Sequence, residues 1–72
     1  MDGKPHIGQM IKAEVLRQGK TSLWFAEQLG CTYMNVYKIY NRSWITTDQL
    51  FTISHILGHD FFEDLSQFCK SI

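Results

Sequence analysis

The chain has 72 residues and a formal net charge of zero, and 44% of its residues are hydrophobic. This length predicts one domain over residues 1–72, with a compact core, because chains this short bury only about 60% of their unfolded surface. No apolar run reaches the roughly 18 residues of a membrane span, no signal peptide is recognisable, and two cysteines are too few for a disulfide framework. We therefore expect a cytoplasmic protein with reduced thiols and no membrane segment.

The zero net charge hides an asymmetry between the two parts of the chain. Residues 1–47 hold six Lys or Arg against three acids, a balance of +3, whereas residues 48–72 hold one Lys against four acids, a balance of −3. The distribution of charge is therefore more informative about partners than the net charge of the whole chain. The first part of the chain is basic enough to bind an anionic partner.

The N-terminal region predicts a flexible tail followed by a helix. Residues 1–5 are polar and include Gly3 and Pro5. From residue 7 to residue 18, the apolar residues recur at i, i+4 and i+8, which is typical of one helix face, and Gly19 then ends the helix. The residues of this stripe are Ile7, Ile11 and Val15, widened by Met10.

Residues 22–41 predict two short helices joined by a sharp turn. Thr21 is a good cap for the first helix, Gly30 can take the left-handed conformation that ends it, Cys31 can plug the corner, and Thr32 can cap the second. Apolar residues recur with the spacing of two amphipathic helices that share one core, at Phe25, Ala26, Leu29, Val36, Ile39 and Tyr40. Trp24 lies off this face and is either a lid on the core or part of an exposed contact surface.

Helices joined this tightly cross at a steep angle, so the second helix protrudes. This arrangement is a helix-turn-helix, and its usual use is to place the second helix in the DNA major groove.

The remaining residues predict two further helices. After a polar loop at 41–43, Trp44 and Ile45 are expected to pack back on the core. Thr46 with Gln49, and Asp60 with Glu63, have the spacing of capping boxes that begin a fourth helix, ending at Gly58, and a short fifth helix toward residue 68. The buried stripe of the fourth helix is Leu50, Ile53, Ile56 and Leu57. No window alternates as a strand does, so the predicted fold class is all-α.

The order and spacing of these features resemble the lambda-repressor-like helix-turn-helix domain of the XRE family, over residues 6–65. The resemblance implies a compact five-helix fold and a DNA-binding transcriptional regulator. It is carried by Ile7-Gly8, Ile11, Phe25-Ala26-x-x-Leu29-Gly30, Val36-x-x-Ile39, Leu50-x-x-Ile53-x-x-x-Leu57-Gly58 and Asp60-Phe61-Phe62-Glu63.

Four exposed residues of the predicted third helix, about 33–41, are the candidates for contacts to DNA bases. Asn35 can bond adenine through two hydrogen bonds, Met34 can contact a thymine methyl group, and Tyr33 offers a ring face and a hydroxyl group. Tyr37 completes the set. Plain solvent-exposed surface is the alternative, but two tyrosines and a methionine are unusual for that role.

Phosphate contacts are expected on both sides of this helix, because positive side chains and helix N-termini attract phosphates. The candidates are Lys20, Thr21, Ser22, Lys38, Asn41, Arg42 and Ser43. The family often has Gln at the position of Ser22, bonding both a phosphate and the first recognition residue, and Ser22 is too short for both. The family favours Gly at the position of Arg42, where an arginine in a left-handed turn costs about 1 kcal/mol unless Asn41 takes the turn.

Other functional classes have weaker support. His55, His59 and Asp60, with Cys69, lack enough convergent donors for zinc, so no metal or other cofactor is expected. No nucleophile–base pair, phosphate-binding loop or paired carboxylate is present, so the chain is not expected to be an enzyme. A protein–protein interaction module that keeps the fold without binding DNA remains the alternative.

The expected partner is double-stranded DNA with a pseudo-palindromic operator. One module this small makes few base contacts, so we expect a homodimer, at least on DNA. The apolar C-terminal residues Phe62, Phe68 and Ile72 are its expected contact, although they could equally close the core.

Overall fold

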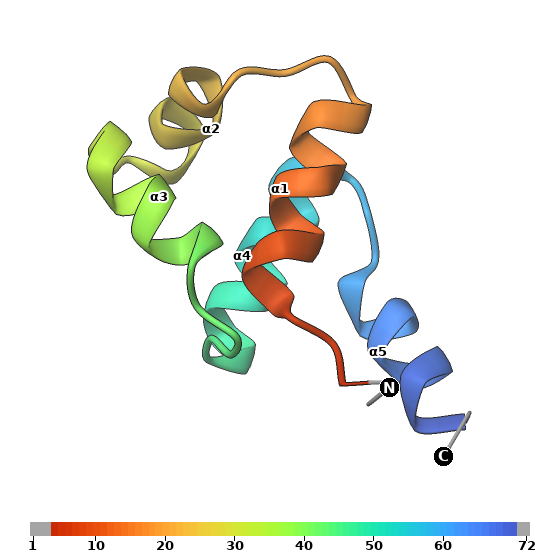
Figure 1. Ribbon diagram of the computed structural model, residues 1–72. Helices are drawn as coiled ribbons and strands as arrows, with labels where there is room; N and C mark the ends of the chain where they lie inside the picture. Colours follow the sequence, from red (N-terminus) through yellow and green to blue (C-terminus); the bar gives the residue numbers. More distant parts are fainter. Residues whose placement is uncertain (1–3, 71–72) are drawn as a thin grey trace.

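The computed structural model describes residues 4–70, which form five α-helices and no strand (Figure 1). The helices are α1 (Ile7–Arg17), α2 (Ser22–Leu29), α3 (Tyr33–Tyr40), α4 (Thr47–Leu57) and α5 (Phe61–Lys70). The Cα radius of gyration is 12.1 Å, near the roughly 11 Å of a compact domain of this length. The prediction of a compact all-α domain of five helices is confirmed, with boundaries within two residues of those expected.

Each helix begins where the side chain of the preceding residue bonds a free backbone N–H group. Thr21, Thr32 and Thr46 accept hydrogen bonds from the N–H groups three residues later, and Asp60 accepts one from Glu63. These are the predicted N-caps. The cap of α1 was not predicted: His6 Nδ1 accepts from the Gln9 N–H group at 3.1 Å.

Gly19, Gly30 and Gly58 all have a left-handed backbone at a helix end. The sequence predicted this conformation for Gly30, and for Gly19 and Gly58 it predicted that the helix ends there. No other residue between 4 and 70 has a positive φ angle. The left-handed turn expected after α3 is therefore wrong: Asn41 is right-handed, with φ −88°, and the chain passes through Arg42 without a strained backbone.

The core is built from one stripe of each helix. The stripes of α1 and α3 are as predicted, and Tyr40 and Phe25 are among the largest fully buried side chains. The buried apolar residues are Ile7, Ile11, Val15, Phe25, Ala26, Val36, Ile39, Tyr40, Leu50, Ile53, Leu57 and Phe61. Trp24 packs against this core and is thus a partial lid.

The N-terminus of α1 is joined to the C-terminal end of α3. The N–H groups of Ile7 and Gly8 donate to the carbonyl groups of Ser43 and Arg42, at 3.0 and 2.9 Å. Gln9 Nε2 donates to the Tyr40 carbonyl group at 3.0 Å. Backbone groups that a helix end leaves without partners are thus paired across two helices, which fixes α3 on the body of the domain.

Gly8 allows this close approach. A Cβ atom at this position would lie 2.3 Å from the carbonyl oxygens of both Ile39 and Tyr40. Only a residue without a side chain permits the two backbones to be this near.

Two side-chain placements differ from the prediction. Trp44 does not return to the core but is 57% exposed, whereas Ile45 packs against the core. The reason is that the backbone hydrogen bonds from α1 to Arg42 and Ser43 set the course of the loop after α3. Cys31 packs against the core but is only half-buried, because it also borders a surface pocket.

α5 lies on the opposite side of α1 from α2 and α3 (Figure 1). It anchors to the core through Phe61, with Leu65 packed beside it. Residues 1–3 of the expected tail and Ile72 lie outside the described residues. Within the described ones, the helices are all too short or too polar to cross a membrane.

Candidate nucleic-acid interface

The outer surface of α3 carries large side chains that the core does not use. Met34 is 72% exposed, Tyr33 48% and Tyr37 41%. The chain contains no Asp or Glu from residue 28 to residue 47, a stretch that includes all of α3 and the loop after it. α3 therefore presents exposed apolar groups and contributes no negative charge of its own.

The two tyrosines of this surface form one structure. They are one turn apart, with ring centroids 5.0 Å apart and nearly perpendicular ring planes. Their hydroxyl oxygens are 3.0 Å apart, at hydrogen-bond distance. The hydrogen bond between the two hydroxyl groups raises the pKa of Tyr33 and lowers the pKa of Tyr37.

Tyr40 connects this pair to the core. Its ring packs against that of Tyr37, with centroids 5.5 Å apart, and lies parallel to the ring of Phe25. Its hydroxyl group is 3.0 Å from Ser22 Oγ. Burial raises the pKa of Tyr40, which the bond from Ser22 partly offsets. Ser22, a predicted phosphate contact, thus holds α2 to α3.

The other predicted contacts at the start of α2 also have roles within the domain. Thr21 is the cap that accepts from the Trp24 N–H group. The Lys20 ammonium group lies 4.9 Å from the centroid of the Trp24 ring, a cation–π contact. Lys20 remains exposed, so its charge is still presented to solvent.

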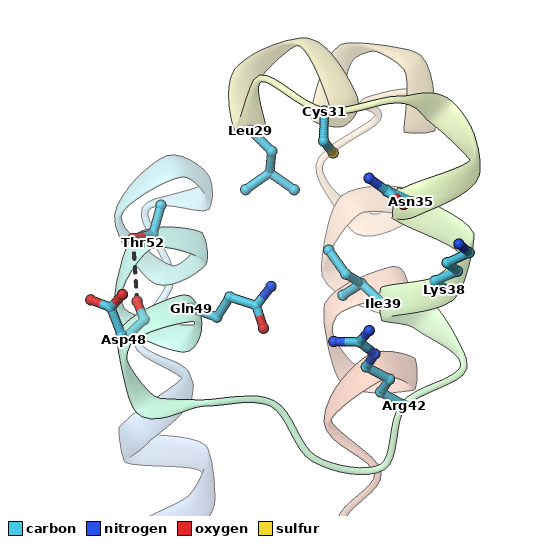
Figure 2. Close-up of a pocket in the computed structure, with 9 residues that line it drawn as sticks. All are labelled: Leu29, Cys31, Asn35, Lys38, Ile39, Arg42, Asp48, Gln49 and Thr52. Carbon is cyan, nitrogen blue, oxygen red and sulfur yellow. Dashed lines mark hydrogen bonds between the residues drawn. The ribbon is translucent and has the colours of Figure 1, made fainter.

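A second group of predicted residues lines an open pocket of about 360 Å³ between α3 and α4. Asn35, Lys38 and Arg42 lie on one side, and Figure 2 shows them opposite Asp48, Gln49 and Thr52 of α4. Leu29, Cys31 and Ile39 complete the lining. The pocket brings Asn35 beside the predicted phosphate contacts Lys38 and Arg42, rather than beside Tyr33 and Tyr37.

Asn41 and Ser43 are exposed in the segment after α3. The backbone of Asn41 ends the helix, and the carbonyl group of Ser43 accepts from Ile7. Their side chains are at the surface and flank Arg42 in the sequence.

Lys12 of α1 is a charged residue of this surface that the sequence analysis did not assign. It lies close enough to Tyr37 for its charge to lower the pKa of that phenol. The signal was a positive charge beside the buried stripe of α1, but which helix lies next to it depends on the tertiary structure.

The histidines considered as metal ligands are separated. His55 is exposed on α4, whereas His59 Nε2 is 2.6 Å from Asp64 Oδ2 and its Nδ1 is 3.7 Å from Glu14 Oε1. No three His, Cys, Asp or Glu side chains within residues 4–70 are grouped so that they could hold a metal ion.

Glu14 is a buried carboxylate on the inner side of α1. It accepts hydrogen bonds from Arg17 and from Gln18, whose amide also donates to the carbonyl group of Leu57 at 2.6 Å. The bond from Arg17 is the main reason that the pKa of Glu14 falls to about 2, with smaller contributions from Gln18 and His59 against the opposing effect of burial. This network ties α1 to the end of α4 and is structural.

Comparisons with models of protein families, with curated proteins and with solved structures found no match to this chain.

Proposed function

We propose that this chain is a sequence-specific DNA-binding transcriptional regulator of the helix-turn-helix type. α2, the turn at residues 30–32 and α3 would form the motif, with α3 in the major groove. The observation that carries the proposal is the outer surface of α3, where exposed Tyr33, Met34 and Tyr37 stand in a stretch without acidic residues. The resemblance to the XRE family supports the same assignment.

The positions of the side chains suggest a division of roles. Tyr33, Met34 and Tyr37 belong to the exposed surface of α3 and are the proposed base contacts. Lys38 and Arg42, with Lys20, Asn41 and Ser43, are the proposed phosphate contacts, which set register without reading sequence. Asn35 borders the pocket with Lys38 and Arg42, so its contact to a base depends on how deeply α3 enters the groove.

Dimerisation on a pseudo-palindromic site is part of the proposal. One helix offers few base contacts, and two copies double them. Phe62 of α5 is 38% exposed and lies near Phe51 of α4, with which it lines a shallow groove. The groove is lined by residues of α4 and α5, and α5 lies on the opposite side of α1 from α3 (Figure 1), so contact between copies through α5 leaves α3 available.

A protein–protein interaction module is the second candidate. It is favoured by Trp44, which is 57% exposed and has no role in the DNA proposal. Large exposed apolar residues of this kind are found at protein interfaces.

The two candidates differ in their response to salt. We expect the chain to bind random duplex DNA at low salt and to lose affinity steeply as salt rises, because bound phosphates release counterions. Replacing Lys38 or Arg42 with Ala should lower the slope of log affinity against log salt by about one unit each. Met34→Ala and the distant Lys70→Ala are the controls and should leave this slope unchanged. Absence of salt-dependent binding would favour the interaction module.

A further inference from the structure

The pocket between α3 and α4 has an apolar wall and a polar rim. The apolar wall is formed by Leu29 at the end of α2, Cys31 in the turn, and Ile39 of α3, which is only 6% exposed. The rim carries polar side chains from both α3 and α4. The pocket volume of about 360 Å³ lies within the range of about 300–1,000 Å³ that is usual for small-molecule sites.

Side chains from two helices converge on this pocket. Asn35, Ile39 and Arg42 follow one another at i, i+4 and i+7, so they lie on one face of α3 and its C-terminal end. Figure 2 shows all three directed toward α4, from which Gln49 is directed back toward α3. The pocket therefore has an amide group on each side and a guanidinium group beside them.

The polar ends of these side chains are not used by the fold. Within residues 4–70, the hydrogen bonds of Asn35 and Gln49 are made by their backbones, whose N–H groups bond the caps of α3 and α4. Arg42 also uses its backbone, which donates to α3 and accepts from α1. The two amides and the guanidinium group thus remain available to another molecule.

The charges around the pocket favour an anion. Lys38 and Arg42 are positive, and Asp48 is the one acidic residue within residues 4–70 that lines the pocket. Figure 2 shows its carboxylate group directed away from α3. A guanidinium group can hold both oxygens of a carboxylate through two parallel N–H bonds. An inorganic anion could use the same bonds but would leave the apolar wall uncovered, whereas an anion with an apolar body covers it.

We propose that this pocket binds a small organic carboxylate, whose apolar body lies on the apolar wall and whose carboxylate group is held by Arg42. Asn35 and Gln49 supply further hydrogen bonds. A bound carboxylate occupies Arg42, a proposed phosphate contact, and adds negative charge beside α3, so the ligand competes with duplex DNA. The binding site stands on the pocket alone, whereas its regulatory effect rests on the proposed DNA-binding function.

The first experiment measures binding of benzoate to the full chain without DNA. Nuclear magnetic resonance should show saturable shifts of the side-chain amide signals of Asn35 and Gln49. The rate at which the uncharged reagent iodoacetamide modifies Cys31 should fall about twofold at half-saturation, because the ligand covers this thiol. Cys69 of α5 is the internal control, and its rate should not change. Absence of saturable shifts in the two amides would overturn the inference.

Two other probes separate the parts of the ligand at equal ionic strength. Benzamide has the shape of benzoate without its charge, and inorganic phosphate has charge without the apolar body. Each should bind at least about tenfold more weakly than benzoate, because each lacks one of the two contacts. Phosphate binding as tight as that of benzoate would show that the pocket holds only phosphate groups, and the inference would be wrong.

The residue that holds the carboxylate group is tested by substitution. Arg42→Ala should weaken benzoate binding at least about tenfold, the worth of a charge-assisted hydrogen bond. The backbone bonds of Arg42 to α1 and α3 do not depend on its side chain, so thermal melts should show a folded variant. Lys70→Ala, at the end of α5, is the matched control and should bind benzoate as the wild-type protein does. Equal affinity of Arg42→Ala and the wild-type protein would contradict the assignment.

The last experiment measures duplex binding while benzoate replaces chloride at constant ionic strength. For a competitor, the apparent Kd for the duplex should rise about twofold at the half-saturating benzoate concentration and about tenfold at ten times that concentration. In Arg42→Ala the same additions should have little effect. If benzoate occupies the pocket of a DNA-binding wild-type protein without weakening duplex binding, the competition is wrong. If no duplex is bound in a salt-dependent way, the proposed function is wrong, and the titration without DNA still decides whether the pocket binds carboxylates.

Discussion

Gly8 offers the most direct test of how α3 is held. Alanine normally favours a helix over glycine, by up to about 1 kcal/mol within the helix. At this position the added Cβ atom would lie 2.3 Å from the carbonyl oxygens of Ile39 and Tyr40, about 1 Å inside ordinary contact. Both oxygens belong to the backbone of α3 and cannot rotate away, so Gly8→Ala should force α1 and α3 apart.

The cost follows from what holds the two helices together. Moving α1 by this distance weakens the bonds from Ile7, Gly8 and Gln9 to the end of α3, each worth about 1 kcal/mol. Overpacking adds about 1–3 kcal/mol. After the helix-propensity gain is subtracted, we expect a loss of about 2–5 kcal/mol of unfolding free energy. A domain of this length has only about 4–11 kcal/mol in total.

Far-ultraviolet circular dichroism during thermal unfolding measures this loss. At about 4–8 °C for each kcal/mol, the Tm of Gly8→Ala should fall by at least about 8 °C. Gly19→Ala is the matched control: Gly19 has a φ of +72° but no atom near its Cβ position, so only the backbone conformation is penalised, by about 1–2 kcal/mol. A Tm for Gly8→Ala equal to or above that of wild type would refute the role assigned to the α1–α3 contact.

Three further predictions concern other parts of the chain. The folded-state pKa of Glu14, about 2, lies below the ordinary value of 4.5, so the contribution of Glu14 to stability is complete above pH 4.5 and is lost as pH falls toward 2. The unfolding free energy of Glu14→Gln, measured in urea, should therefore depend less on pH across that range than that of the wild-type protein. An equal dependence in the two proteins would contradict the role assigned to Glu14. Cys69 is exposed and Cys31 is half-buried, so Cys69 should react faster with a thiol reagent in the native state. Equal reaction rates of the two thiols would contradict this difference in burial. Light scattering should show a homodimer on operator DNA, and Phe62→Ser should weaken it; a monomer with and without DNA would exclude the dimer.

The features that could be predicted from the sequence are those with local causes. A helix cap depends on a residue and the N–H group three positions later, so Thr21, Thr32, Thr46 and Asp60 were identified correctly. The left-handed glycines are local in the same sense.

The errors and omissions have distant causes. The exposure of Trp44 depends on a loop whose course is set by backbone bonds to Ile7 and Gly8, more than thirty residues earlier. The expected strain at Arg42 is absent for the same reason, since α3 ends against α1 and no left-handed residue is needed. The hydroxyl bond between Ser22 and Tyr40 joins two helices, so neither the phosphate assignment of Ser22 nor the core assignment of Tyr40 anticipated it.

The inner and outer surfaces of α3 are supported by different contacts, and this separation matters for function. Its inner stripe, Val36, Ile39 and Tyr40, is buried, and its C-terminal end is bonded to α1. Met34 contributes to neither support, so a substitution there changes what α3 presents with little effect on stability. Tyr37 is the exception, because it contacts both Tyr33 outside and Tyr40 inside. A change in its side chain therefore alters the presented surface through geometry as well as through chemistry. Tyr37→Phe keeps the ring contacts and removes only the hydroxyl group, so it separates the chemical effect from the loss of packing that Tyr37→Ala adds.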